Sequence, residues 1–462
     1  MHARHAPTRH RLRITTIITT VIVVLLLFAT GTRLFSDSSV LGLLRRRDFS
    51  ARAHASTDEG CLHFCDAAAG AACPHHQPDG GDAPDACVLR NVVLRDSAEA
   101  LEFAAPRGAL PARLALQPGP LRFEGVVGSG VPLSRECVVR GTTLLVTNYQ
   151  QHIPHFGEGL FFALSGLLVA DGELLCLTGH ECHLMFHQRV HWPERVSVAW
   201  HEGALAVAKD AVPPHLPKAL NTDLFNVAGA ARSAELMPGC SLGALEFERI
   251  ALVNSRYGRR WFSGPPACAS FRDAALRLHV PGASDMGVLQ RGAIALLERR
   301  GSRNIVNIDE VREALLKRFG VPVRMLSFEG LTFGEQVRAL HDVRLLVAPH
   351  GAGLTNLVFL PPGAALVEIF PLHWRPGLYF DSLAESCGVW HGAYQNEEIA
   401  AAELSASCRE TFGEHMPPLL ECPDQARCID CGKQSSTSVD VARLDVVIAA
   451  AEAHLKKSSV DT

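Results

Sequence analysis

The sequence predicts an α/β fold built around a parallel sheet, and two features of its second half carry this prediction. Beyond residue 292, short apolar runs alternate with amphipathic segments of helical period, which is typical of parallel strands linked by right-handed crossovers. A charge-free, glycine-broken loop then separates two apolar runs in VAPHGAGLTNLVFLPPGAALVEIFP, residues 347–371. Because ligands bind at the carboxyl ends of parallel strands, this loop is a candidate binding site.

The elements expected in this half follow one another in a regular order. Strands are predicted at 293–298, 323–328, 344–348 and 365–370, helices at 307–319 and 332–340, and a short helical turn at 355–360. Asn307 with Glu310, and Thr332 with Glu335, have the spacing of capping boxes at the starts of the two helices. Gly320 is expected to stop the first helix.

The loop after the strand at 344–348 combines residues that ordinary packing does not require. These residues are His350, Gly351, Gly353, Thr355 and Asn356. The two glycines are expected to take positive φ and to let the backbone approach a ligand, while free N–H groups at the start of the helical turn suit a pyrophosphate. The alternative is a tight strand-to-helix turn in which glycine serves geometry alone and the histidine is a cap.

Charged residues lie at neighbouring strand ends. Arg299 and Arg303 follow the strand at 293–298, and a guanidinium matches phosphate oxygens with two hydrogen bonds. A solvated basic turn is the alternative. Glu368 lies inside the apolar run ALVEIF, where a carboxylate buried without a partner costs several kcal/mol. Ribose hydroxyls and a structural arginine are the two expected partners.

Composition and charge exclude some classes of protein. The chain has 462 residues, 47% of them hydrophobic, which is enough for two compact domains and excludes a mostly disordered chain. Its formal net charge of −4 provides no broadly basic surface, so nucleic acid is not an expected partner.

The N-terminus has the pattern of a membrane address. Residues 1–13 are basic without an acid, and residues 14–30, ITTIITTVIVVLLLFAT, carry no charge. At about 1.5 Å per residue this run spans roughly 25 Å as a helix, which suits a signal-anchor in a thin membrane. A cleaved signal peptide is the alternative, because Ala29 and Gly31 have a cleavage-like spacing.

The chain has fourteen cysteines, which in an exported protein indicate disulfides. The pair Cys428 and Cys431 has the spacing of half a zinc site, but no second close pair of Cys or His accompanies it. Disulfides are therefore expected in preference to zinc.

The sequence resembles glycosyltransferase family 61. The loop at 347–371 carries the most specific part of the resemblance, and LLERRGSRNIVNIDEV, LSFEGLTFGEQVRALHDVRLLVA, VNSRYGRRWF, FRDAALRLHV and TNYQQHIPHFGEGLFFAL support it. The resemblance covers the chain from Thr147 to the C-terminus. It implies a GT-B type fold, with two Rossmann-like domains facing a cleft behind an N-terminal membrane anchor and stem.

The same resemblance implies an inverting glycosyltransferase that moves a sugar from a UDP-sugar, the nucleotide-sugar donor, to a glycan or glycoprotein acceptor. It implies a single-pass type II protein of the Golgi or endoplasmic reticulum membrane with a lumenal catalytic part. The chain contains no Asp-x-Asp triplet, so no metal and no other cofactor is expected, and arginines and helix N-termini would supply the positive potential.

These expectations divide the chain into six segments. They are a cytosolic tail at 1–13, a transmembrane signal-anchor at 14–31, a stem and cysteine-rich entry at 32–120, an N-terminal Rossmann-like acceptor domain at 121–280, a C-terminal Rossmann-like nucleotide-sugar domain at 281–400, and a cysteine-containing segment with a closing helix at 401–462.

An inverting transfer needs a base for the acceptor hydroxyl, and HFGEGLFFAL offers Glu158 first and His155 second near the start of an apolar helix. In the alternative, Glu158 only favours a helix N-terminus and His155 is a core side chain. The family motif of this region is matched with looser spacing by Asn148, His152 and Phe156. A catalytically silent family member that binds carbohydrate or a partner protein is the alternative function.

Overall fold

A computed structural model describes the chain in segments. The described residues are 61–62, 86–96, 101–105, 126–127, 138–149, 152–168, 182–188, 198–211, 220–226, 246–253, 261–262, 264–283, 288–377, 379–397, 404–413 and 416–459. The chain divides into two units, Met1–Arg52 and Ala53–Thr462, and every described residue lies in the second. The expected tail and anchor lie outside the described residues. Within the described segments, no helix has the length and hydropathy to cross a membrane.

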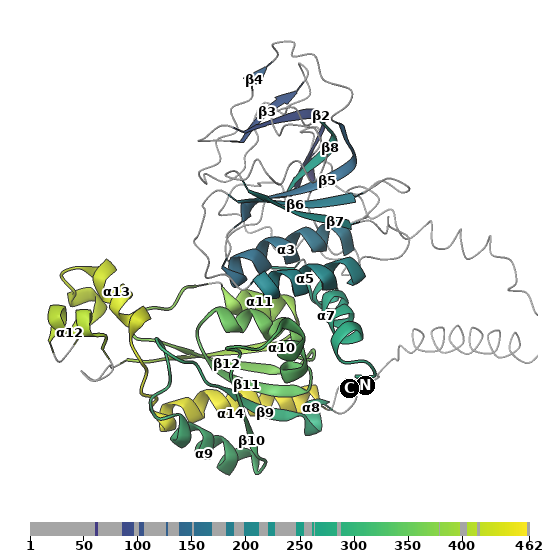
Figure 1. The fold of residues 1–462 in the computed structure, drawn as a ribbon. Helices are drawn as coiled ribbons and strands as arrows, with labels where there is room; N and C mark the ends of the chain where they lie inside the picture. Colours follow the sequence, from purple (N-terminus) through teal and green to yellow (C-terminus); the bar gives the residue numbers. More distant parts are fainter. Residues whose placement is uncertain are drawn as a thin grey trace, which may run out of the picture. The chain divides into compact units, whose positions relative to one another are not determined.

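The second half of the chain forms a five-stranded sheet in the order β10-β9-β11-β12-β13 (Figure 1). Its strands are β9 (Ala293–Leu297), β10 (Val323–Leu326), β11 (Val343–Pro349), β12 (Ala365–Phe370) and β13 (Trp390–Gln395). All neighbouring strands are parallel, which confirms the predicted parallel sheet. After β10 the chain returns to the other side of β9, so the strand order reverses between β9 and β11. In doubly wound sheets this reversal is where ligands bind.

Two groups of helices lie on opposite sides of this sheet in Figure 1. One group is α8 (Val288–Arg291), α9 (Ile308–Phe319) and α14 (Val441–Ser458), in which α14 contacts the other two helices. The other is α7 (Pro265–His279), α10 (Phe333–Leu340) and α11 (Phe380–Ser386), which all contact the 3₁₀ helix η3 (Ala352–Phe359). The predicted helical turn therefore exists, but it begins at residue 352, three residues earlier than expected.

One of the two predicted capping boxes is present. The Thr332 hydroxyl accepts a hydrogen bond from the Glu335 backbone N–H, and the Glu335 carboxylate accepts one from the Thr332 N–H at 2.8 Å. The box predicted at Asn307 is wrong. Its amide donates to Glu310 Oε2 and to the Val439 carbonyl instead, so it joins α9 to the segment before α14. The expected stop at Gly320 is confirmed by its left-handed φ of 65°.

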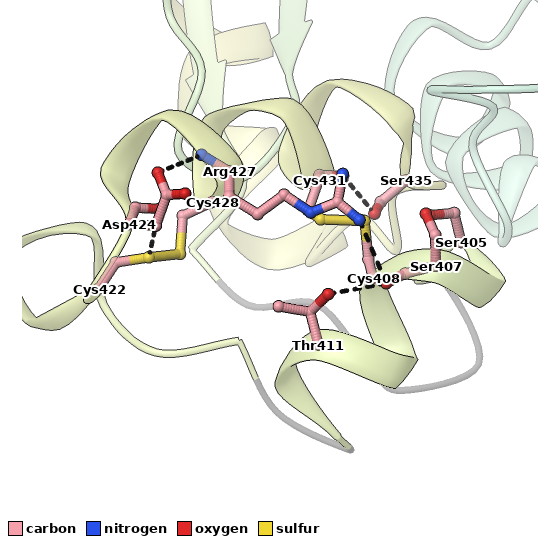
Figure 2. Close-up of a disulfide and its surroundings, with 10 residues drawn as sticks. All are labelled: Ser405, Ser407, Cys408, Thr411, Cys422, Asp424, Arg427, Cys428, Cys431 and Ser435. Atoms are coloured by element: carbon pink, nitrogen blue, oxygen red, sulfur yellow. Dashed lines mark hydrogen bonds between the residues drawn. A yellow bond between two sulfur atoms is a disulfide. The ribbon is translucent and has the colours of Figure 1, made fainter.

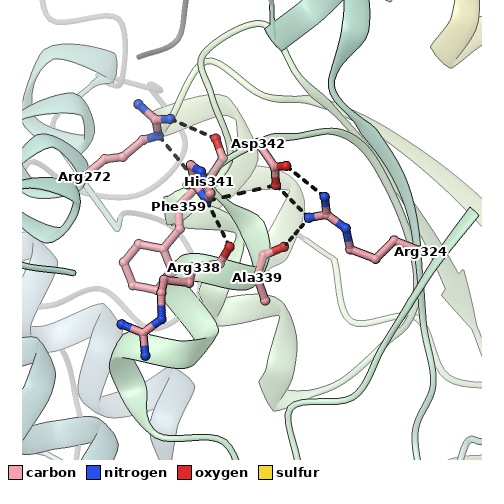
Figure 3. Close-up of polar contacts among 7 residues, drawn as sticks. All are labelled: Arg272, Arg324, Arg338, Ala339, His341, Asp342 and Phe359. Atoms are coloured by element: carbon pink, nitrogen blue, oxygen red, sulfur yellow. Dashed lines mark hydrogen bonds and ion pairs between the residues drawn. The ribbon is translucent and has the colours of Figure 1, made fainter. Parts of the chain in front are cut away.

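Arginine side chains join elements near the amino-terminal end of β11 (Figure 3). Arg324 on β10 donates to both carboxylate oxygens of Asp342, at 2.6 and 2.8 Å, just before β11 begins. The Arg324 hydrogen bonds lower the pKa of Asp342. Arg272 of α7 is buried and donates to the backbone carbonyls of Phe359 and His341. These contacts hold η3 and the end of α10 against α7.

The first half of the chain contributes an eight-stranded mixed sheet, in the order β4-β3-β2-β8-β5-β6-β7 with β1 beside β2. Its strands are β1 (Cys61–Leu62), β2 (Ala86–Asp96), β3 (Leu101–Ala105), β4 (Val126–Val127), β5 (Val138–Tyr149), β6 (Cys182–Gln188), β7 (Leu220–Asn226) and β8 (Glu246–Val253). The run β8-β5-β6-β7 is parallel, whereas β2 pairs with β8 in antiparallel fashion. The sheet thus extends a parallel part with strands from the segment expected to be stem and entry.

Helices α3 (Ile153–Leu168) and α5 (Val198–Ala211) follow β5 and β6. They join the same hydrophobic cluster as α7, α10 and η3, and each of these elements contributes an aromatic ring to it: Phe161, Trp200, Phe271, Phe333 and Phe359. Neighbouring rings in this group have centroids 4.8–6.5 Å apart. Through this aromatic packing, α3 lies directly against the helices that accompany the five-stranded sheet.

Disulfides join the C-terminal part of the chain, as expected. Cys268 of α7 pairs with Cys387 at the end of α11. Cys408–Cys431 and Cys422–Cys428 connect α12 (Ala406–Phe412), the 3₁₀ turn at 419–421 and α13 (Gln425–Gln434), as Figure 2 shows. The zinc alternative at Cys428 and Cys431 is thus wrong. Cys182 is also disulfide-bonded, and the cysteines at 65, 73, 137, 176 and 240 lie outside the described residues.

Candidate functional site

The loops that follow β9 and β11 meet where the strand order reverses. A β-carbon added to Gly351 would lie 2.1 Å from Arg299 Nη1 and 4.0 Å from Arg303 Nη1. Arg299 is oriented by its own loop, because its Nε donates to the Ser302 carbonyl at 2.8 Å. The structure therefore brings together the two arginines and the glycine loop that the sequence singled out.

Neither glycine of the loop has the left-handed, positive φ that was expected. The φ of Gly351 is 165°, which is an extended conformation that any residue adopts, and the φ of Gly353 also lies outside the left-handed region. Both positions instead require a residue without a β-carbon. A β-carbon at Gly353 would lie 3.0 Å from the Phe328 ring, just as one at Gly351 would strike Arg299.

Arg303 is the unusual residue of this loop. It has a φ of 61°, a conformation that non-glycine residues rarely adopt. Its guanidinium lies over the Trp374 ring, 5.3 Å from the centroid. Desolvation and the charge of Arg299 lower the pKa of Arg303 to about 10, and desolvation also lowers the pKa of Arg299. Two desolvated cations side by side are a setting that favours an anion between them.

His350 lies at the end of β11 among Phe370, Trp374 and Phe380. Its Nδ1 is 2.5 Å from Glu368 Oε1, and the other oxygen of Glu368 is 2.7 Å from His391 Nε2 on β13. Burial alone would raise the pKa of Glu368, but the hydrogen bonds and charges of the two histidines outweigh it and hold the pKa below its ordinary value.

The partners expected for Glu368, ribose or an arginine, are therefore corrected to two histidines. Sequence reasoning missed His391 because the strand WHGAYQ that carries it has little apolar character. Glu368 pairs with residue 393 of the neighbouring strand, and residues two apart on a strand lie on the same face of the sheet. This strand register is the signal that places His391 on the same face as Glu368.

The side-chain amide of Asn356 is bound by other elements, whereas the buried Thr355 hydroxyl has no hydrogen-bond partner in the described part of the chain. Their expected roles in holding a donor stay predictions. Asn356 is 2% exposed, its Oδ1 accepts from Trp200 Nε1 at 2.9 Å, and its Nδ2 donates to Gln336 Oε1 at 2.7 Å. Thr355 is fully buried, and its methyl group lies 3.1 Å from the position of a β-carbon on Gly157. Thr355 thus packs η3 against α3, and Asn356 joins η3 to α5 and α10.

The first two turns of α3 carry the expected catalytic candidates. His155 Nδ1 lies 3.1 Å from the Tyr379 hydroxyl and 3.7 Å from Glu158 Oε2. The His155 side chain is 15% exposed and that of Glu158 only 4%, so His155 is the more accessible of the two. Sequence reasoning missed Tyr379, which belongs to a segment 224 residues away.

Electrostatics connects this helix start with the arginine loop. Desolvation, followed by the charges of His155, Arg303 and Arg299, lowers the pKa of His152 to about 4. His152 lies one residue before α3, so α3 begins within electrostatic reach of both arginines. The two groups of candidates, far apart in the sequence, also meet at η3, because a β-carbon on Gly157 of α3 would lie 3.1 Å from the Thr355 methyl group.

Proteins with α/β folds bind phosphorylated ligands at the switch point of a doubly wound sheet, with arginines and glycine turns. These are the residues that lie at this switch point. Residues 176–367 match the family model described as Glycosyltransferase 61. The resemblance to glycosyltransferase family 61 is thereby confirmed. The matched residues include Arg299, Arg303 and the loop at 350–356, whereas His155 and Glu158 precede them and Glu368 follows directly.

Curated relatives agree with the family match. The chain is 37% identical over 109 residues to protein O-linked-mannose beta-1,4-N-acetylglucosaminyltransferase 2 of Xenopus laevis, covering 23% of this chain and 19% of the relative. It is 37% identical over 86 residues to the protein of the same name from Homo sapiens, covering 19% and 15%. It is 28% identical over 109 residues to the xylan glycosyltransferase MUCI21 of Arabidopsis thaliana, covering 23% and 22%. The matched segments thus span about a fifth of each relative, and the family and these relatives are glycosyltransferases.

Proposed function

We propose that this chain is an inverting glycosyltransferase that transfers a sugar from a UDP-sugar to a glycan or glycoprotein acceptor. The observation that carries the proposal is the contact of Arg299 with Gly351 at the β9–β11 switch, inside the region that matches the family. The names of the relatives, an N-acetylglucosaminyltransferase acting on O-linked mannose and a xylan glycosyltransferase, support a sugar as the acceptor.

In this proposal the diphosphate of the donor binds between the loops after β9 and β11. Arg299 and Arg303 provide guanidinium donors, and the backbone of Gly351 and Gly353 approaches the phosphates because neither residue has a side chain. Glu368 acts through His350, whose ring it orients from behind. The desolvation of both arginines supports a strong attraction for phosphate without an obligatory metal.

The acceptor hydroxyl attacks the anomeric carbon on the face opposite the diphosphate, the bond from this carbon to the phosphate oxygen breaks, and UDP leaves. His155 takes the hydroxyl proton, and the nearby Glu158 carboxylate stabilises the resulting imidazolium. The greater exposure of His155 supports this order of roles over direct action of the more deeply buried Glu158. Tyr379 fixes the orientation of the His155 ring.

The setting we propose is the Golgi or endoplasmic reticulum, with residues 14–31 as a type II anchor and a GT-B arrangement of the two halves. The disulfides support an oxidising compartment. The contact of α3 with η3 supports a site that uses both halves of the chain.

A panel of UDP-sugars tests the proposal on the full-length protein, scored by thermal shift and by UDP release in the presence of EDTA. We expect at least one UDP-sugar to raise the melting temperature and to be hydrolysed slowly without an acceptor. Stabilisation without hydrolysis by any of them would favour the catalytically silent alternative. The absence of both effects would contradict the proposed donor class.

A further inference from the structure

Trp374 lies beside two cations that come from distant parts of the chain. The Arg303 guanidinium is 5.3 Å from its ring centroid, and the ammonium group of Lys433 is 5.2 Å from the same centroid. The His350 ring meets Trp374 edge to face at 4.4 Å. An aromatic face attracts cations, so Trp374 holds both positive groups next to His350.

Lys433 belongs to α13, in the segment joined by two disulfides. The backbone of this helix packs directly on the loop that carries Trp374, because a β-carbon on Gly432 would lie 2.0 Å from the Leu372 carbonyl oxygen. Cys431, the residue before Gly432, is held to α12 by its disulfide with Cys408 (Figure 2). The position of Lys433 is thus determined by close backbone packing and a covalent link.

The same segment also holds the arginine loop. The Ser435 carbonyl accepts a hydrogen bond from the Arg303 N–H at 2.8 Å, and Thr437 N–H donates to the Asn304 carbonyl at 2.8 Å. The same segment therefore holds the backbone at Arg303, where φ is positive, and places the Lys433 ammonium group beside the Trp374 ring.

Neither of the two cations beside Trp374 has a buried acidic partner among the described residues, because the buried Glu368 carboxylate binds His350 and His391 instead. In the described part of the chain, no carboxylate forms an ion pair with Arg303, and its buried Nε has no hydrogen-bond partner. Among the residues that the structure describes, Lys433 pairs only with Asp430, at 3.6 Å, and the two side chains are 38% and 55% exposed. Exposed pairs of this kind are weak, so Lys433 is available to a stronger anion.

We propose that Lys433 is a further donor-binding residue that contacts the diphosphate together with Arg303, and that Trp374 positions both cations before the donor arrives. The inference rests on the proposed function, since it takes the diphosphate of a UDP-sugar as the ligand. It adds the disulfide-bonded C-terminal segment to the donor site.

Calorimetry on the full-length protein, with UDP, UMP and uridine in EDTA, tests this inference. Lys433→Met removes the charge at similar volume, Lys433→Arg keeps it, and Lys457→Met is a control at an exposed lysine on α14. We expect Lys433→Met to weaken UDP binding about tenfold or more, as for loss of a charged hydrogen bond, and to leave uridine binding unchanged. Lys433→Arg should restore most of the affinity, Lys457→Met should match the wild type, and Trp374→Leu should weaken UDP binding in the same direction.

Arg299→Ala separates failure of the inference from failure of the proposed function. If Arg299→Ala loses UDP affinity while Lys433→Met binds UDP like the wild type, the donor site stands and the role of Lys433 is wrong. An equal loss for UDP and uridine in Lys433→Met would mean a structural role and would also overturn the inference. If the wild type binds no UDP, both proposals fail together.

Discussion

Gly351 and Arg299 are packed so closely that no β-carbon fits between them: one added at Gly351 would lie 2.1 Å from Arg299 Nη1. The atom it would strike is at the far end of a flexible side chain, and the Gly351 backbone is extended, so an alanine there requires no strained backbone. A substitution at Gly351 therefore displaces the guanidinium without disturbing the strand.

Gly351→Ala should consequently separate binding from stability. We expect a melting temperature close to that of the wild type and a UDP affinity lower by about tenfold, the size of one charged hydrogen bond. Gly377→Ala, where an added β-carbon meets nothing within 4 Å, is the matched control and should change neither quantity. Unchanged UDP affinity in Gly351→Ala would show that the Arg299 position is irrelevant to the donor.

Glu368 should make stability depend on pH in the acid range. Its folded-state pKa lies below the ordinary value of 4.5, so the carboxylate stabilises the fold above that pH, and this contribution is lost as pH falls through the folded pKa. Glu368→Gln should lower the free energy of unfolding by about 1.5–3 kcal/mol at pH 7. The difference from the wild type should shrink as pH falls below 4.5.

Denaturant unfolding at a series of pH values measures this difference. Glu313→Gln, at an exposed position of α9, should follow the wild type at every pH. A Glu368→Gln deficit that stays constant from pH 7 to pH 3 would rule out a carboxylate that is charged in the folded protein.

His155 and Glu158 should affect turnover and spare donor affinity, because they act on the acceptor hydroxyl. We expect Glu158→Gln and His155→Asn each to lower turnover by about two orders of magnitude or more while UDP affinity stays near the wild-type value. A transfer assay and calorimetry on both variants provide the two quantities. Near-normal turnover in both variants would show that the start of α3 takes no part in the reaction.

The Cys268–Cys387 disulfide closes a loop with a sequence separation of 119, whereas Cys422–Cys428 closes one of only 6. If loop entropy dominates, removing the first pair with a double alanine substitution should cost about 4–5 kcal/mol of unfolding free energy, and removing the second about 2 kcal/mol. Chemical denaturation of the two variants compares these losses directly. The opposite ranking would show that local packing outweighs chain entropy.

Four of the five strands were predicted from short apolar runs, of which β12 is completely buried, whereas β13 has little apolar character and was not predicted. The two capping patterns predicted the helix starts less well than the apolar runs predicted the strands. The Thr332–Glu335 box formed, but the Asn307 amide found a partner in Val439, more than a hundred residues away, which no local pattern reveals.

Within the site, sequence reasoning found the residues that adjoin strand ends, such as Arg299 and Gly351. It missed His391 and Tyr379, because only the folded chain brings these side chains to Glu368 and His155. The partners of the Asn356 side chain were not predictable for the same reason: they come from elements that the pattern of the loop does not show.

The most direct measurement of the central claim compares two adjacent arginines. Arg299 is desolvated and packed against Gly351, whereas Arg300 is 80% exposed and 3.8 Å from Glu329. We expect calorimetry in EDTA to show that Arg299→Ala binds UDP at least about tenfold more weakly than the wild type, while Arg300→Ala stays within about twofold. Equal UDP affinity in Arg299→Ala and the wild type would contradict a diphosphate site at the β9–β11 switch.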